Sequence, residues 1–310
     1  MMKSFIALFI LFNIVNAELP GTWPPLDKPA PAVAGWSSLI NATNVTNALI
    51  LPPFTSCAQT SGYCRAPCGC YRDEILNCPT KKDWSLTFDD GPSDYTSRLV
   101  DFLNAQNVKA TFYVVGSQVY RYPDVLKKIY DSGHEIGVHT WSHSSLTSLS
   151  NEQIIAEIKH TELAVWQVTG IATRTIRPPY GDCDDRVRDI IRQLGYKLVL
   201  WDSDTQDYLS NSNPKFDLNW IAGNFTQWTS KDKGKTGHIS LEHDLFPQTT
   251  LAAERAVPIL KKARYNMVTP ATCNRISAYA FPAPSTHSLS TTSGGVPSNS
   301  TSKNNKHIKK

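Results

Sequence analysis

Seven short apolar runs, separated by stretches with a helical pattern, constrain the fold of this 310-residue chain most strongly. Runs of this kind, bounded by turn residues, are typical of strands buried on both faces of a sheet. Parallel strands need a crossover segment between them, usually a helix, so the alternation indicates a parallel α/β sheet. The runs cover residues 84–88, 110–115, 135–138, 175–177, 197–201, 238–241 and 265–268.

Three of the intervening segments carry recognisable helix signals. Pro123 suits the first turn of a helix, and Gly133 suits its end. Ser150 followed by Gln153 forms a capping box, which predicts a helix starting at that point. A third apolar stripe over 187–194 predicts another amphipathic helix.

Acidic and imidazole residues follow two of the predicted strands. Asp89 and Asp90 come after the first run, and His139 and His143 after the third. One Asp and two His suit a borderline metal such as zinc and leave a position open for water. The other carboxylate is then a candidate general base. The spacing of four predicts a helical turn that puts both His rings on one side.

Polar residues at the ends of five different predicted strands also suggest how the sheet closes. In a closed barrel the carboxyl ends of the strands converge on one mouth, whereas an open doubly wound sheet spreads them along a crevice. About seven strands favour an incomplete barrel. The residues at these ends are Asp89, His139, Arg177, Asp204 and His243.

Five short motifs occur in order: TFDDGP at 87–92, HTWSH at 139–143, RPPY at 177–180, DTQDY at 204–208 and LEH at 241–243. In this order they resemble the polysaccharide deacetylase family (carbohydrate esterase family 4, the NodB homology domain), and the fungal chitin deacetylases most. The resemblance covers roughly 84–268. It implies a distorted, incomplete (β/α) barrel and metal-dependent removal of N-acetyl groups from chitin or chitooligosaccharides.

The resemblance assigns roles to the acidic and imidazole residues. It makes Asp89 the general base, and it makes Asp90, His139 and His143 the metal ligands. The implied ion is zinc; cobalt, nickel or manganese could occupy the same ligands. His243, in the last motif, would be the general acid that protonates the leaving amine.

Two further charged residues belong to the expected catalytic set. Arg177 would pair with Asp89 and hold its carboxylate in place. Asp207 resembles the acid that orients Arg177 in turn. The alternative for both is an ordinary structural ion pair.

Four residues are expected to contact the substrate or to be plain core residues. The backbone amide of Tyr180 would donate to the oxyanion, and Leu241 would line a pocket for the acetyl methyl group. Tyr208 stands where the family more often has Trp, and it could stack on a sugar ring. For Trp141, sugar stacking and simple burial stay open.

Seven cysteines indicate a disulfide framework, because the apolar stretch 5–15 predicts a signal peptide and therefore an oxidising compartment. Five of them fall within 57–78. A small zinc knot is the alternative, and the absence of paired Cys-x-x-Cys units disfavours it. Cys273 could tie back to this cluster, giving three bridges and leaving Cys183 over, with the pairing open.

An apolar stretch near residue 1 and several sequons predict that the protein is secreted. Residues 1–17 read as a signal peptide, since the apolar stretch 5–15 is too short to span a bilayer; an uncleaved anchor is the alternative. No later segment could span a membrane. Sequons predict glycosylation in a secretory pathway, and we expect an extracellular or cell-wall protein. They begin at Asn41, Asn44, Asn224 and Asn299.

The net charge of +4 comes from the four lysines of 276–310, a Ser/Thr-rich segment without acids that we expect to be disordered. The remainder is formally neutral, which excludes a basic footprint for nucleic acid. We therefore divide the chain into a signal peptide, an irregular glycosylated segment, a Cys-rich staple, a catalytic domain and a basic tail, and expect a monomer. The divisions are 1–17, 18–56, 57–80, 81–275 and 276–310.

Two other functions fit the same sequence. An acetylxylan or peptidoglycan deacetylase would share the mechanism and differ in substrate. A non-catalytic wall-binding protein could retain the fold, but the complete set of acidic and imidazole residues argues against it.

Overall fold

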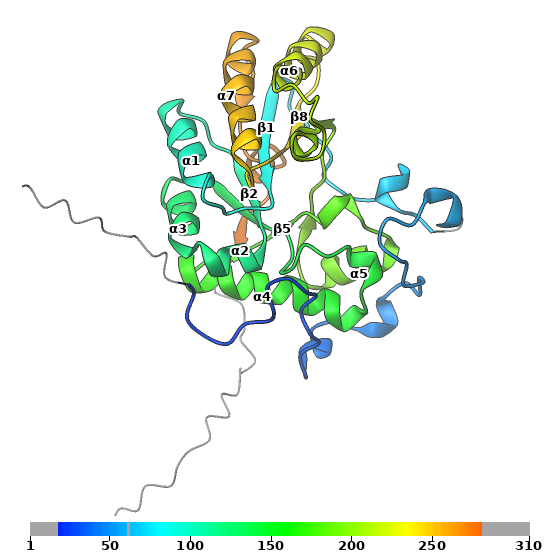
Figure 1. Cartoon of the computed structure of the whole chain (residues 1–310). Coiled ribbons are helices and arrows are strands. Elements are labelled where there is room, and N and C mark those ends of the chain that lie inside the picture. The colour runs from blue at the N-terminus through cyan, green and yellow to red at the C-terminus, as the bar shows by residue number, and fades with distance from the viewer. Residues whose placement is uncertain (1–17, 61–62, 281–310) are drawn as a thin grey trace, which may run out of the picture.

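The computed structural model describes residues 18–60 and 63–280. Its centre is a curled half-barrel of seven strands in the order β6-β5-β3-β2-β1-β8-β7, with every neighbouring pair parallel (Figure 1). This confirms the predicted incomplete barrel. The strands are β1 (Asp83–Asp89), β2 (Thr111–Val114), β3 (Glu135–Val138), β5 (Thr175–Ile176), β6 (Lys197–Leu198), β7 (Ser203–Asp204) and β8 (His238–His243).

Three more strands are only two residues long. β9 (Asn266–Met267) pairs with the start of β1, while β4 (Ala172–Thr173) and β10 (Tyr279–Ala280) form a separate antiparallel pair. The predicted runs include the equally short β5, β6 and β9, but no apolar run of the sequence covers β4, β7 or β10.

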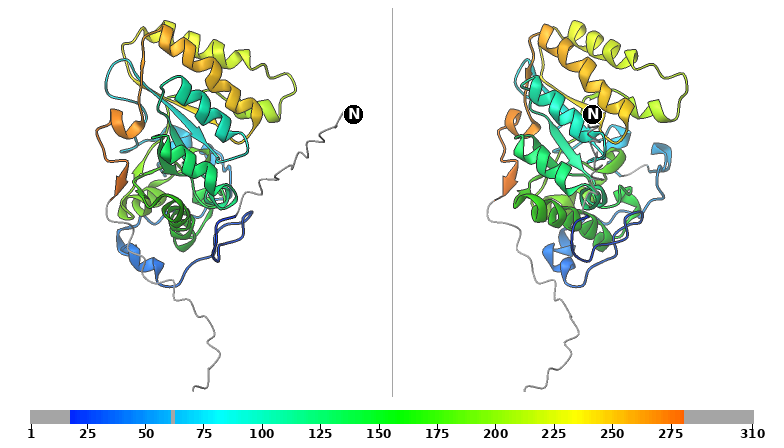
Figure 2. Two further views of the ribbon diagram at one scale, coloured as in Figure 1. Left: turned by 90° about the vertical axis from the view of Figure 1, so that its left-hand side faces the viewer. Right: turned by 60° about the vertical axis from the view of Figure 1, so that its left-hand side comes forward.

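Helices surround the strands, and α6 and α7 lie side by side in both Figure 1 and Figure 2. The three predicted helices are confirmed as α3, α4 and α5. At the start of α4, the Ser150 hydroxyl accepts from the Gln153 amide at 3.3 Å, and the Gln153 side chain accepts from the Ser150 amide at 3.1 Å. The helices are α1 (Thr96–Ala105), α2 (Gly116–Arg121), α3 (Pro123–Asp131), α4 (Asn151–Thr169), α5 (Asp185–Gln193), α6 (Asn219–Asp232), α7 (Pro247–Lys262) and α8 (Pro270–Cys273).

Strand β1 is enclosed by the hydrophobic core. Successive residues Trp84 to Asp89 are all buried, so this strand is covered on both faces. Trp84, Leu86 and Phe88 are fully buried, and burial of each such side chain stabilises the fold by about 1.5–3 kcal/mol. The chemically important end of β1, at Asp89, is thereby fixed by its hydrophobic packing.

Three disulfides staple the chain, joining Cys57 to Cys68, Cys64 to Cys70 and Cys78 to Cys273. The three-bridge prediction is confirmed, and the zinc knot is excluded because its cysteines are bonded to one another. Cys183 is the remaining cysteine; it is free and buried.

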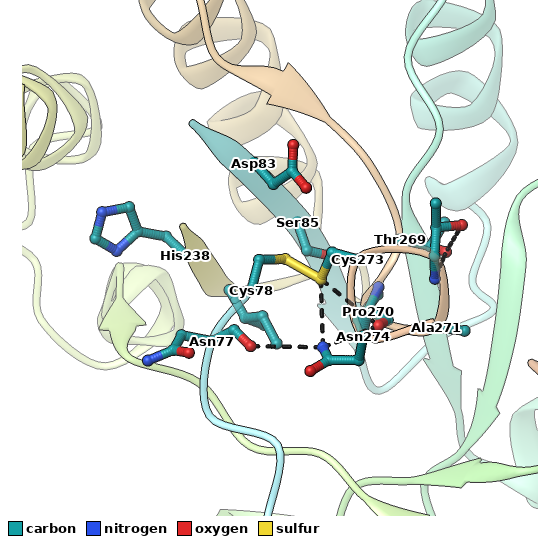
Figure 3. Close-up of a disulfide and its surroundings, with 12 residues drawn as sticks. Asn77, Cys78, Asp83, Ser85, His238, Thr269, Pro270, Ala271, Cys273 and Asn274 are labelled. Atoms are coloured by element: carbon teal, nitrogen blue, oxygen red, sulfur yellow. Dashed lines mark hydrogen bonds between the residues drawn. A yellow bond between two sulfur atoms is a disulfide. The ribbon is translucent and has the colours of Figure 1, made fainter. Parts of the chain in front are cut away.

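The bridge between Cys78 and Cys273 ties the Cys-rich segment to α8, beyond the last strand of the barrel (Figure 3). Asn274, next to it, donates a side-chain hydrogen bond to the Pro270 carbonyl at 3.0 Å. The bridge spans 195 residues, for which the chain-entropy model gives about 5 kcal/mol of stabilisation.

The segment 18–56 is irregular and contains only short 3₁₀ turns. It wraps over the domain surface: the Leu19 amide donates to the Tyr120 carbonyl at 2.9 Å, and the Leu51 amide donates to the Thr147 carbonyl at 3.0 Å. Among residues 18–60 and 63–280, no helix is long and apolar enough to cross a membrane. The predicted signal peptide and most of the basic tail lie outside the described residues.

Candidate active site

Asp90, His139 and His143 come together at the carboxyl ends of β1 and β3. Their candidate ligand atoms all lie within 4.8 Å of one another. The Nε2 atom of His143 is 3.1 Å from Asp90 Oδ1, and that of His139 is 3.4 Å from the same oxygen. The strand-end placement thus assembles the predicted three-residue cluster.

The predicted helical turn between the two histidines is wrong. Residues 139–143 form a loop in which Thr140 (φ 68°) and His143 (φ 58°) are left-handed. Such a conformation costs a non-glycine residue about 1–3 kcal/mol and persists only where its surroundings hold it. The rings therefore meet through a constrained loop rather than through helical spacing.

The buried carboxylate of Glu157, on α4, holds that loop. Its Oε2 accepts hydrogen bonds from the amides of Trp141 and Ser142, both at 2.8 Å. Its Oε1 accepts from the Ala30 amide at 2.6 Å, so the same side chain also binds the N-terminal segment. Burial raises the pKa of Glu157, and these donors oppose that shift.

Trp141 is a structural residue. Its side chain is fully buried, its indole donates to the Pro25 carbonyl at 2.9 Å, and its ring stacks on Trp23 with centroids 5.5 Å apart. It has no surface to offer a sugar, so the question left open by the sequence is resolved in favour of burial.

The cluster fits a divalent metal ion. Asp90 Oδ1 is buried, and no described residue gives it a hydrogen bond of good geometry. Burial alone would raise the pKa of Asp90, but the His143 and His139 imidazoles lower it well below its usual value. His139 Nδ1 donates to the Arg177 carbonyl at 2.6 Å, which leaves Nε2 with a free lone pair beside Asp90. An ionised carboxylate and oriented imidazoles are ligands that zinc accepts.

Asp89 lies beside this cluster in an ion pair with Arg177. Arg177 Nη1 is 2.8 Å from Asp89 Oδ1, while Asp89 Oδ2 is 3.7 Å from His139 Nε2. Arg177 is fully buried; it donates to the Thr87 hydroxyl at 2.7 Å and lies over the Tyr113 ring at 4.3 Å. One oxygen of Asp89 is thus fixed by Arg177, and the other faces the candidate metal ligands Asp90, His139 and His143.

The expected contact between Asp207 and Arg177 is wrong, because the described contacts of Asp207 are with His243. Asp207 Oδ1 is 2.6 Å from His243 Nδ1, and Asp207 Oδ2 accepts from the His243 amide at 2.9 Å. Arg177 is oriented instead by Thr87 and by the carbonyls of Val199 and Leu200.

The Asp207 carboxylate changes the titration of His243. Burial alone would lower the pKa of His243, but Asp207 outweighs it and raises that pKa to about 10. His243 is therefore protonated at neutral pH, with Nδ1–H directed at Asp207 and Nε2–H available as a proton donor.

Asp89, the Asp90 cluster and His243 line a single cavity. Its volume of about 480 Å³ is within the range usual for small-molecule sites. Tyr180 and Tyr208 line it and are each about half exposed, whereas Leu241 is buried. The Tyr180 ring meets His143 edge-on at 4.7 Å, and the Tyr208 ring meets His243 at 5.8 Å. Tyr180 therefore borders the side with the candidate metal ligands, and Tyr208 borders the side with the His243 imidazolium.

Asp204, expected at a strand end facing the mouth, does line the cavity, and two further lining residues, Phe54 and Trp201, were not expected there. Trp201 is the last residue of the predicted strand 197–201, and its place at a carboxyl end could have suggested it. Phe54 comes from the irregular segment before the first disulfide, where no periodic or motif signal points to it.

The fold and these side chains define a partial (β/α) barrel with one cluster of candidate metal ligands and an opposed imidazolium at its mouth. Residues 76–199 match the family model described as polysaccharide deacetylase. The chain is 38% identical to chitin deacetylase 1 of Cryptococcus neoformans over 79% of this chain and 57% of that protein.

Two solved structures share the fold. The chitin deacetylase of Colletotrichum lindemuthianum has a TM-score of 0.63 and 31% identity, covering 67% of this chain and 95% of that one. A peptidoglycan deacetylase from Bacillus subtilis has a TM-score of 0.55 and 31% identity, covering 64% and 92%. The chain belongs to the polysaccharide deacetylase family. It spans only 53–57% of the length of the curated relatives it matches first.

Deacetylases of carbohydrate esterase family 4 are metalloenzymes, in agreement with the cluster at Asp90.

Proposed function

We propose that this chain is a secreted, monomeric chitin deacetylase, which hydrolyses N-acetyl groups of N-acetylglucosamine polymers to acetate and free amines. The observation that carries the proposal is the meeting of Asp89, the Asp90 cluster and His243 in one cavity. A base, a metal site and an acid are the three components that amide hydrolysis by water requires.

The ion in the proposed site is zinc, with cobalt as the alternative, held by Asp90, His139 and His143. When bound, it supplies Lewis acidity, which lowers the pKa of water and polarises a carbonyl group. The Arg177 carbonyl orients His139 so that Nε2 faces the site, and the low pKa of Asp90 keeps its carboxylate ionised. Both residues are therefore ready to bind the ion.

Asp89 accepts the proton of the attacking water through Oδ2, because Arg177 occupies Oδ1. The Tyr180 amide stabilises the oxyanion: no described residue accepts a hydrogen bond from it, and the left-handed backbone at Tyr180 (φ 60°) orients it. A preorganised donor of this kind lowers such a barrier by about 3 kcal/mol.

His243 donates its Nε2 proton to the departing nitrogen, and Asp207 keeps it protonated until then. Leu241 contacts the acetyl methyl group, and the exposed rings of Tyr180 and Tyr208 contact sugar. Water adds to the acyl carbon, the C–N bond breaks, and the products are acetate and an amine.

The family model covers 76–199, but Asp207, Leu241 and His243 lie beyond it. We therefore propose 81–275 as the catalytic domain, preceded by the irregular segment 18–56 and the staple 57–80. Three disulfides support an oxidising, extracellular or cell-wall location.

Peptidoglycan is the second candidate substrate, because the Bacillus subtilis peptidoglycan deacetylase shares the fold at 31% identity. Acetylxylan is a third, and a non-catalytic wall-binding role is the remaining alternative. Acetate release from chitin oligomers, peptidoglycan fragments and acetylxylan decides among them. We expect the highest kcat/KM with chitin oligomers, loss of activity with a chelator, and recovery with zinc. Preference for another polymer would replace the substrate, and binding without acetate release would favour the wall-binding role.

A further inference from the structure

Phe54 is an unusually placed aromatic residue at the mouth of the cavity. Its side chain is 73% exposed, and it lines the same cavity as the metal-binding cluster. It lies in the segment before the first disulfide and outside residues 76–199 matched by the family model. An isolated exposed aromatic residue needs no explanation, but this one forms part of a built surface.

The Phe54 ring continues an aromatic row that starts at the metal-binding cluster. His143 meets Tyr180 at 4.7 Å, and Tyr180 meets Phe54 edge-on at 4.9 Å and 71°. Phe54 is therefore one ring further from the cluster than Tyr180, and both rings keep exposed surface.

The backbone presents Phe54 in a conformation that sequence alone does not favour. Its φ is 58°, a left-handed value that is an outlier for a bulky residue. Hydrogen bonds on either side hold the loop in place: the Leu51 amide donates to Thr147, and Arg65 donates to the Thr55 carbonyl at 2.8 Å. Strain that is held in place in this way is a common mark of a functional position.

A buried ion pair between Arg65 and Asp182 connects the loop of Phe54 with the loop of Tyr180. Arg65, which holds Thr55, pairs with Asp182 at 2.7 Å, and both side chains are almost fully buried. The Asp182 amide in turn donates to the Pro179 carbonyl, beside Tyr180. The loops that carry the two aromatic rings are thus joined by one rigid connection.

We propose that Phe54 binds a sugar ring next to the one that reacts, so that the segment before the first disulfide extends the substrate-binding site. The inference rests on the proposed function for its substrate class, a β-linked N-acetylglucosamine oligomer. The apolar C–H face of such a ring packs on an aromatic face, which contributes area and little conformational entropy loss. Phe54 touches no reacting group, so it acts through binding rather than through the chemical step.

The test compares Phe54→Ala, Phe54→Leu and Phe54→Trp with wild type on the N-acetylglucosamine hexamer. Tyr71→Ala is the matched control, because Tyr71 is an exposed aromatic residue of the Cys-rich segment that does not line the cavity. We expect Ala and Leu to raise KM about threefold to tenfold, the range typical of aromatic contacts, with kcat within about twofold of wild type. Phe54→Trp and Tyr71→Ala should match wild type.

A wild-type KM in Phe54→Leu would overturn the proposal, because Leu keeps the apolar volume and lacks the ring. Loss of kcat at unchanged KM in Phe54→Ala would overturn it too. If wild type releases no acetate from any oligomer, the proposed function fails; calorimetric titration of the hexamer into the same proteins then still decides the role of Phe54. A weaker binding constant in Ala and Leu alone would support it, and equal constants would refute it.

Discussion

Asp207 and His243 are joined twice, by a 2.6 Å contact between Oδ1 and Nδ1 and by a 2.9 Å hydrogen bond from the His243 amide to Oδ2. The two residues come from the turn after β7 and from the end of β8, 36 positions apart in the chain. This pair sets both the position and the charge of the proposed general acid.

Replacement of Asp207 by Asn removes the charge that raises the pKa of His243 to about 10. We expect the alkaline limb of the kcat/KM profile to move toward lower pH by at least about one unit, since a nearby carboxylate typically shifts a pKa by that much. A profile identical to wild type would show that His243 is not the acid. The control is Asp202→Asn, which disturbs His238 at the opposite end of β8.

The same pair makes stability depend on pH. Because the pKa of His243 is higher in the folded than in the unfolded chain, its contribution is fully present below about pH 6.5 and is lost as pH rises through about 10. Denaturant unfolding across that interval should show a steeper loss of stability in wild type than in His243→Gln. Parallel curves for the two proteins would contradict the raised pKa.

Replacement of Arg177 should lower the stability of the protein far more than replacement of an arginine in an exposed ion pair. Its guanidinium is fully buried against Asp89, and removing one partner of a buried pair costs about 3–5 kcal/mol. We predict that Arg177→Met lowers the free energy of unfolding by that amount and abolishes activity. Arg98→Met, which breaks an exposed pair with Glu254, should change stability by less than about 1 kcal/mol. Equal losses in the two variants would disprove the buried role.

Glu157→Gln tests how the loop 139–143 is held. The amide cannot accept four hydrogen bonds as the carboxylate does, so the loop should loosen and the metal affinity should fall about 10–100-fold. Competition with a chromophoric chelator measures this directly, and excess zinc should restore most of the activity. Glu162→Gln on the same helix, which loses a pair with Lys159, is the control. An unchanged affinity in Glu157→Gln would assign the loop's order to other contacts.

Cys78 and Cys273 lie at the opposite end of the barrel from the site, near Asp83 and His238 at the beginnings of β1 and β8 (Figure 3). Changing both to Ser should lower the free energy of unfolding by about 2–5 kcal/mol while kcat at 25 °C stays near wild type. Thermal unfolding and acetate release in parallel separate these effects. A large fall in kcat at full folding would mean that this bridge shapes the site.

The sequence predicted the barrel well because its strands are marked locally. The runs that became β1, β2 and β3 are continuous and apolar, and buried parallel strands need little more to be recognised. Asp89 and His139 could be placed at one mouth because their strands end directly before or at them. Strand β7, at Ser203–Asp204, lies outside every apolar run and carries no comparable signal.

The contacts that the sequence did not predict depend on tertiary structure. The spacing of His139 and His143 suits a helix, and nothing local shows that Thr140 and His143 adopt left-handed conformations. Arg177 and His243 were both candidate partners for Asp207 at the mouth. Only the packing of the barrel places Asp207 beside His243. Phe54 reaches the cavity because Arg65 and Asp182, 117 positions apart, meet in the interior.

The most direct test of the account measures metal content and acetate release together in Asp89→Asn. Asp89 is isosterically changed, and Asp90, His139 and His143 are untouched, so we predict one equivalent of bound zinc as in wild type. Acetate release from the chitin hexamer should fall at least about 100-fold, the lower end of what general base catalysis contributes. Full activity in this variant, or a wild-type protein that binds no divalent ion, would contradict the central claim.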